Sequence, residues 1–162
     1  MNTSTLTSAL TTLFSELVDG APSKNSYMLN AGDAGLLASL DALSATAAST
    51  VPAGGGASIA AHVDHLRYGL SLMNRWSAGE NPFEDADWSQ SWERGTVDDA
   101  AWARRRAELR DETRRWLDVL RTPRDVSDVE LTGMIGTIAH LAYHVGAIRQ
   151  IDRVTRGPAA NE

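Results

Sequence analysis

Apolar side chains recur every three or four residues in four long stretches of the chain, a spacing that gathers them on one face of an α-helix. These stretches predict long helices at about 5–18, 59–77, 97–120 and 129–154. The stripes of the second and fourth are Ile59, Val63, Leu66, Leu70 and Met73, and Met134, Ile138, Leu141, Val145 and Ile148. A short helix is predicted from Asp33 to Leu43, with a brief turn starting at Ser44. No stretch shows the two-residue alternation of a strand, so the chain is predicted to be all-α.

Glycine and proline separate these helices. The breaks lie at 20–22, 52–56 and 122–123, and Ser58 precedes the second long helix as a candidate N-cap. Gly157-Pro158 ends the last helix, and we expect the tail to fray from about residue 155.

The connection at 79–96 is long enough to set the topology. At up to about 3.3–3.6 Å per residue it can recross a whole helix, which allows the second and third long helices to run parallel. We therefore predict one domain spanning 1–162, a four-helix bundle with a long crossover between helices two and three and an up-down-down-up topology.

Charge narrows the range of partners. The net charge is -6, whereas binding nucleic acid through phosphates needs a basic surface, so nucleic acid is not expected as a partner. No segment approaches the roughly 18–20 apolar residues of a membrane span, and the first residues lack the basic start of a signal peptide. We expect a soluble, cytoplasmic protein with no membrane partner.

The four histidines form the candidate functional site. His140 and His144 stand four residues apart, so they project side by side from one helix, and His65 lies on the flank of the second long helix. Three neutral imidazoles suit one divalent metal ion and leave a position open for water or substrate, as in catalytic zinc sites. His62 shares a face with His65 and is an alternative third ligand. The competing interpretation is that these histidines are ordinary hydrogen-bonded core residues.

These residues carry a resemblance to the DinB/YfiT-like superfamily. The matching motifs are the Ser58–Leu66 segment (SIAAHVDHL) and the His140–Gln150 segment (HLAYHVGAIRQ). The resemblance implies a four-helix bundle with a metal ion on one histidine from the second helix and two from the fourth. It assigns the first of these to His65, because His65 precedes Leu66. Zinc or nickel is the expected metal, with iron or manganese as alternatives, and homodimers are expected.

Relatives of this kind include metal-dependent transferases that use bacillithiol and isomerases that depend on mycothiol. The resemblance therefore implies a metal-dependent thiol S-transferase, with a low-molecular-weight thiol and an electrophile as small-molecule partners. Since the chain has no cysteine, the sulfur has to come from a cosubstrate. A metal-activated hydrolase and a non-catalytic metal-binding or dimerisation bundle stay open as alternatives. For a hydrolase a carboxylate base is expected, yet Asp64 should point about 100° away from His65.

Candidate substrate-binding residues lie near the same seam, although no catalytic residue is assigned. Arg149 could neutralise an anionic substrate or stabilise the end of its helix, and Tyr68 and Tyr143 could bind substrate or donate a proton. Gly69 could leave room for a ligand beside His65.

Trp88 and Trp92 are expected to pin the long connection onto the bundle. The arginines of the third long helix are interpreted as a solvated face or, alternatively, as a carboxylate clamp or dimer contact.

Overall fold

The computed structural model describes residues 3–22 and 24–159, and within these ranges every regular element is helical. The elements are α1 (Thr3–Asp19), α2 (Gly35–Asp41), α3 (Ala45–Ser49), α4 (Ile59–Ser77), α5 (Gln90–Glu93), α6 (Asp99–Arg121), α7 (Asp128–Ile151) and the 3₁₀ turn η1 (Arg153–Thr155). The prediction of an all-α protein is confirmed.

Side-chain caps fix where the long helices begin. The Ser58 hydroxyl accepts a hydrogen bond from the amide of Ala61 at 3.2 Å, as predicted for the start of α4. The carboxylate of Asp98 caps α6 in the same way. Ser127 and Glu130 form a reciprocal capping box at the start of α7. These local bonds place α6 and α7 within two residues of the predicted starts.

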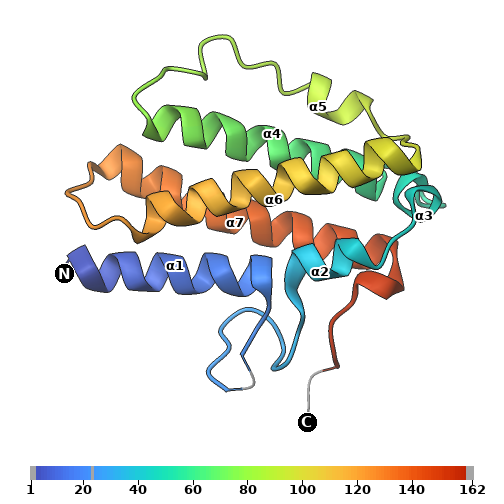
Figure 1. Ribbon diagram of the computed structural model, residues 1–162, viewed down its shortest axis with the longest axis horizontal. Coiled ribbons are helices and arrows are strands. Elements are labelled where there is room, and N and C mark those ends of the chain that lie inside the picture. The colour runs from blue at the N-terminus through green and yellow to red at the C-terminus, as the bar shows by residue number, and fades with distance from the viewer. Residues whose placement is uncertain (1–2, 23, 160–162) are drawn as a thin grey trace.

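The four long helices lie side by side (Figure 1). The chain enters α4 and α6 from the same end of the molecule and enters α1 and α7 from the other. Between α4 and α6 the 79–96 connection returns along the length of α4 (Figure 1). α4 packs against both α6 and α7. The apolar stripes of α4 and α7 are buried as predicted, except that Met73 is half-buried.

The connection contains a helical turn that the sequence analysis did not predict. α5 covers only Gln90–Glu93, and no side chain caps its start. One signal was present, because Trp88 and Trp92 are spaced four residues apart and a helical turn places such a pair on one side.

α7 corrects the expectation about apolar segments. It has 24 residues, and an 18-residue stretch of it has a mean hydropathy of 1.2, so by length and composition alone it is the one helix in the described chain able to cross a membrane. Glycine, alanine and threonine occupy much of its outer surface, so no Asp, Glu, Lys or Arg interrupts residues 131–148. In this structure the helix packs against α1 and α4 and contributes Met134, Ile138 and Leu141 to the core.

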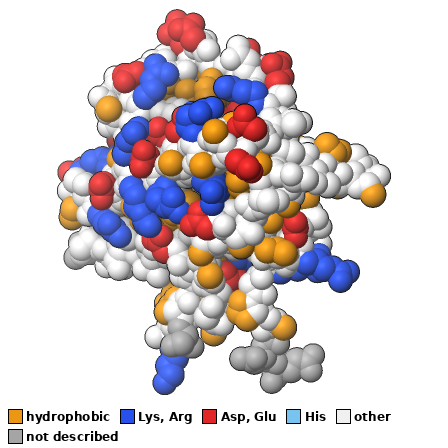
Figure 2. All heavy atoms as spheres, turned by 45° about the vertical axis from the view of Figure 1, so that its right-hand side comes forward, with side chains coloured by type: hydrophobic (Ala, Val, Ile, Leu, Met, Phe, Trp, Pro, Cys, Tyr) orange, Lys and Arg blue, Asp and Glu red, His pale blue; other side chains and the backbone are white. Residues whose placement is uncertain are grey.

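The arginines of α6 meet acidic partners from neighbouring helices. Arg106 and Arg110 share the carboxylate of Asp41 at 2.7 and 2.9 Å, and Arg114 makes two bonds of 2.7 Å to Asp19. Basic and acidic side chains intermingle on the face shown in Figure 2. Arg106, Arg110 and Arg114 are four residues apart on one helix, and these ion pairs to α1 and α2 offset the repulsion between them.

The chain after α7 turns back onto the domain. Thr155 is buried, and its hydroxyl donates to the carbonyl of Asp152 at 2.6 Å. The side-chain amide of Asn30 donates to the carbonyl of Pro158 at 2.7 Å. These bonds place residues 155 and 158 of the expected tail against the domain, and residues 160–162 lie outside the described residues.

Arg149 is engaged within the fold. Its Nη2 lies 2.8 Å from Oδ1 of Asp33, whose side chain is 1% exposed. The same oxygen accepts the amide of Gly35 at 2.8 Å, so the pair joins α7 to the start of α2.

We predict that Arg149→Met lowers the free energy of unfolding by about 2–3 kcal/mol, because Asp33 then keeps a buried charge without its cation. Fully buried pairs typically cost about 3–5 kcal/mol, and the residual exposure of Arg149 reduces this. Urea unfolding measures the effect, with exposed Arg153→Met as the matched control. An equal, small effect of both substitutions would contradict the structural role.

Candidate metal centre

α4 and α7 bring three imidazole rings to one point. The Nε2 atom of His140 lies 3.1 Å from Nε2 of His65 and 2.9 Å from Nε2 of His144. The ligand atoms of all three residues lie within 4.8 Å of one another. His65 and His144 are buried and His140 is half-buried. The predicted convergence of residues more than 70 positions apart is thus present in the structure.

The spacing of these nitrogens fits a metal ion. Four ligands around zinc at 2.0–2.1 Å place neighbouring nitrogens about 3.3–3.4 Å apart. The two measured contacts are a few tenths of an ångström shorter. In the described residues the group contains three histidines and no carboxylate. Such a set can hold a divalent cation and leave a coordination position open.

Ser91 indicates which nitrogen of His65 carries the proton. The hydroxyl of Ser91 lies 2.9 Å from Nδ1 of His65 and 2.8 Å from the carbonyl oxygen of Trp88. For both contacts to be hydrogen bonds, the single hydroxyl proton has to go to the carbonyl of Trp88, because a carbonyl only accepts. Nδ1 of His65 must then be the donor to Ser91, which leaves a lone pair on Nε2. That lone pair points into the group of three.

His62 contacts one of the three histidines and is not itself part of the three-histidine group. Its Nδ1 lies 2.8 Å from Nδ1 of His144, on the side of the ring opposite to the Nε2 that faces His140. A hydrogen bond at Nδ1 fixes the tautomer and orientation of a ligating imidazole. His62 therefore orients His144 and lies outside the three-histidine group.

Burial keeps the rings neutral. Desolvation, reinforced by His140 and His62 and opposed by Asp64, lowers the pKa of His65 to about 4. Desolvation, with smaller effects of His140, His62 and His65, lowers the pKa of His144 to about 3. Burial also lowers the pKa of His62 and of His140. At neutral pH all four rings thus retain a lone pair, the form that binds metal ions.

The α5 turn and Trp88 just before it cover the histidine cluster on one side. The ring of Trp92 stacks on His65 with centroids 4.2 Å apart and planes inclined by 24°. Trp92 also lies edge-on to His62 at 5.4 Å, and Trp88 lies 5.6 Å from His65. Both tryptophans therefore pin the connection, as predicted, but they do so directly on the histidines.

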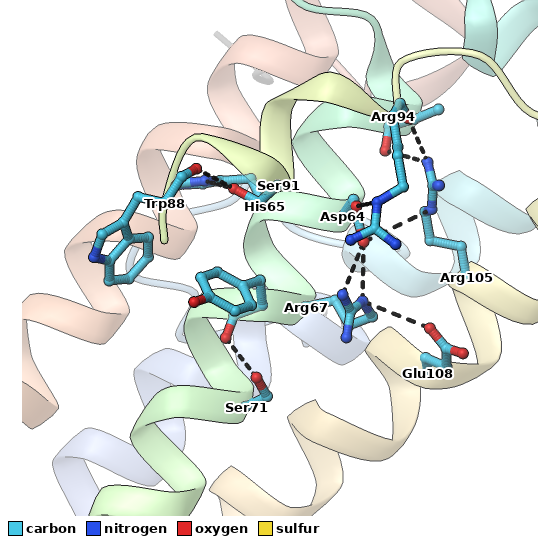
Figure 3. Close-up of polar contacts among 11 residues, drawn as sticks. Asp64, His65, Arg67, Ser71, Trp88, Ser91, Arg94, Arg105 and Glu108 are labelled. Atoms are coloured by element: carbon cyan, nitrogen blue, oxygen red, sulfur yellow. Dashed lines mark hydrogen bonds and ion pairs between the residues drawn. The ribbon is translucent and has the colours of Figure 1, made fainter. Parts of the chain in front are cut away.

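Asp64 lies on the other side of α4 from the histidine cluster and helps to hold α5 in place. Figure 3 shows His65 directed toward Ser91 and Asp64 directed toward three arginines. Nε of Arg67 donates to Oδ1 of Asp64 at 3.0 Å, and Nε of Arg94 lies 3.2 Å from Oδ2. Arg105 lies 3.9 Å from Oδ1 and donates to the carbonyl of Arg94 at 2.7 Å. Since Arg94 directly follows α5, this ion-pair group ties α5 to α4 and α6.

The comparison with known families agrees with this geometry. A family model described as the DinB superfamily matches residues 28–148, which is 121 of the 162 residues. The chain belongs to the DinB superfamily. A search of curated proteins and a search of solved structures each returned no match.

The remaining candidate residues of this DinB protein lie at different distances from the centre. The ring of Tyr143 packs edge-on against His144 at 5.0 Å and is 70% exposed. The hydroxyl of Tyr68 accepts the amide of Asp87 at 3.0 Å and so holds the connection. Arg149 pairs with Asp33. A role of these three in substrate binding stays a prediction.

Ser91 is the contact that the sequence analysis missed. Serine is common in connections, and its importance follows only from the position of α5 over His65. The helical spacing of Trp88 and Trp92 was the available signal, since a turn between them places Ser91, three residues after Trp88, on the same side as both tryptophans.

We predict that the metal-free protein loses stability as the pH falls from about 6.5 toward 4. The folded-state pKa values of His65 and His144 lie below the ordinary 6.5, so the unfolded chain binds more protons in this window. Stability then rises with pH across the window and gains nothing further from these groups above it. Urea midpoints of chelator-treated protein test this. A His65→Gln/His144→Gln variant should have a flatter profile, and parallel profiles would contradict the assignment.

We further predict that Ser91→Ala weakens zinc binding by about 10–100-fold, the usual cost of removing the partner of a ligating histidine. Competition with a chromogenic chelator measures the dissociation constant. Ser89→Ala, on the exposed side of the same segment, is the matched control, and Ser91→Thr should restore most of the affinity. Equal affinity of Ser91→Ala and wild type would refute this role.

Proposed function

We propose that this DinB protein is a metal-dependent S-transferase that moves a low-molecular-weight thiol onto a carbon electrophile. The observation that carries the proposal is a buried group of three neutral imidazoles with no carboxylate and no thiolate among its described members. His65, His140 and His144 would hold one divalent ion, with zinc or nickel preferred over iron or manganese. When bound, that ion would accept a thiol sulfur at its open position and lower the pKa of the thiol.

The protein's own residues prepare this site for a sulfur nucleophile. Ser91 and His62 orient two of the imidazoles, and Trp88 and Trp92 keep water from the His65 side. Because the chain has no cysteine, the nucleophilic sulfur belongs to the cosubstrate. In the reaction a carbon–sulfur bond forms, the leaving group departs with its bonding electron pair, and the thiol proton passes to solvent.

The alternatives fit the site less well. A carboxylate base is expected beside the water of a metal-activated hydrolase, but Asp64 is paired with Arg67 and Arg94 on the far side of α4. A non-catalytic metal bundle would favour a fourth protein ligand, whereas the described group has three members.

We extend the proposal to the helix topology, the oligomeric state, the cellular location and the partners of the protein. The four long helices would form the up-down-down-up bundle expected from the long crossover, and two copies would associate as a homodimer in the cytoplasm. The partners would be a small thiol and an electrophile, with neither nucleic acid nor membrane involved. The opposite directions of α4 and α7 support the bundle (Figure 1), and the mixed charges of one face argue against a basic binding surface (Figure 2).

The test is thiol conjugation by zinc- or nickel-loaded protein. Bacillithiol, mycothiol and glutathione are each offered with benzyl chloride and with iodomethane, and thioether products are quantified by mass spectrometry. We expect at least one thiol to be consumed at a rate well above the uncatalysed reaction. The rate should return to background after chelation and in His140→Ala.

Arg153→Met is the matched control, because it changes an exposed residue outside the site. If loaded wild-type protein conjugates none of the three thiols faster than buffer with the same metal, the transferase proposal fails.

A further inference from the structure

An apolar cavity of about 180 Å³ lies between α4 and α7 beside the three histidines. Leu66 and Gly69 line it from α4, Gly136, Thr137 and His140 line it from α7, and Trp88 closes it from the connection. Gly136 is exposed, so the cavity reaches the surface there. His140 belongs both to this cavity and to the three-histidine group, which makes the two spaces neighbours.

The lining determines what can occupy this space. It contains no charged side chain, and its other members are leucines, a methionine and a glycine. The hydroxyl of Thr137 donates to the carbonyl of Gly133 at 2.8 Å, so its proton is already used. Burying a charge or an unpaired donor among such groups is costly, whereas burying an apolar group is favourable.

The size of the cavity limits the occupant further. An engineered apolar cavity of about 150 Å³ binds benzene. A space of about 180 Å³ therefore accepts one six-membered ring or a short branched alkyl group. A larger groove of about 580 Å³ runs along α1, but it is lined by Tyr27 and by no histidine.

We propose that this cavity is the acceptor subsite, and that it takes an uncharged apolar group, about the size of a benzene ring, carried by the electrophile. The assignment of the cavity to the electrophile rests on the proposed S-transferase function. The binding of an apolar ring in the cavity does not depend on that function. The ring would lie beside His140, with the carbon under attack directed toward the three imidazoles.

Gly69 provides a way to narrow the subsite between Trp88 and His140. A Cβ atom at this position would lie 3.5 Å from Cζ3 of Trp88 and 3.7 Å from Cε1 of His140. Both distances are ordinary contacts, so alanine fits without displacing either ring. Alanine also favours a helix over glycine by about 1 kcal/mol, so Gly69→Ala should fold at least as well as wild type. Gly146→Ala is the matched control, since Gly146 lies in α7 with open space around its Cβ position and does not line the cavity.

The first measurement is a ¹⁹F NMR titration of zinc-loaded protein with 4-fluorotoluene. We expect saturable binding to wild type and to Gly146→Ala, at least tenfold weaker binding to Gly69→Ala, and at least tenfold weaker binding of 4-fluorobenzenesulfonate to wild type. Absence of 4-fluorotoluene binding, or equal binding of the sulfonate, overturns the apolar subsite.

The second measurement compares benzyl chloride with iodomethane in the conjugation reaction. Gly69→Ala should lower the ratio of their kcat/KM values at least tenfold, and Gly146→Ala should leave the ratio at its wild-type value. If wild type conjugates both electrophiles but Gly69→Ala leaves the ratio unchanged, the acceptor role is wrong and the transferase stands. If wild type conjugates neither and 4-fluorotoluene still binds, the S-transferase is wrong and the apolar binding site stands.

Discussion

Nε2 of His140 lies about 3 Å from Nε2 of both His65 and His144. A shared cation or hydrogen bonds between the rings make such an approach of largely buried nitrogens favourable. The packing of α4 against α7 imposes this constraint. Leu66 and Leu70 of α4 and Leu141 of α7 belong to one apolar core, which fixes the register of the two helices. Because the rings are held by a core and not by a loop, their approach is a property of the whole fold.

The surroundings of the rings favour a shared cation. A neutral imidazole can donate one N–H bond to a neighbouring ring, but a doubly protonated ring is disfavoured because burial lowers the pKa of His65 to about 4 and that of His144 to about 3. Ser91 leaves a lone pair on Nε2 of His65, and His62 contacts the opposite nitrogen of His144. The arginines around Asp64 hold α5, and α5 holds Ser91 and the two tryptophans over the site. The ion-pair network around Asp64 thus affects the metal site only indirectly, by holding α5 in place over the histidines.

Much of this architecture could be predicted from the sequence. The stripe of α7 and the cap at Ser58 are local signals, and both survive in the structure because the core and the first helical turn depend on the same residues. His65, His140 and His144 were found because an i, i+4 pair and a third histidine on another helix are visible in one dimension. Family resemblance then distinguished His65 from His62.

Other features depend on contacts that the sequence does not display. α5 has no side-chain cap and only four residues, so packing of Trp88 and Trp92 on the histidines, not local preference, holds it in place. The role of Arg149 depends on Asp33, which is 116 positions away. The hydropathy of α7 was underestimated because glycine and threonine separate its apolar residues, although its outer face carries few charges. For α5 and for Arg149 the decisive partner lies far away along the chain.

The most direct test of the account is calorimetric titration of chelator-treated protein with zinc. The account predicts one zinc ion per chain for wild type, retained stoichiometry in His62→Ala, and loss of the site in His140→Ala, since Nε2 of His140 contacts both other ligands. Absence of stoichiometric binding in wild type, or unchanged binding in His140→Ala, would contradict it.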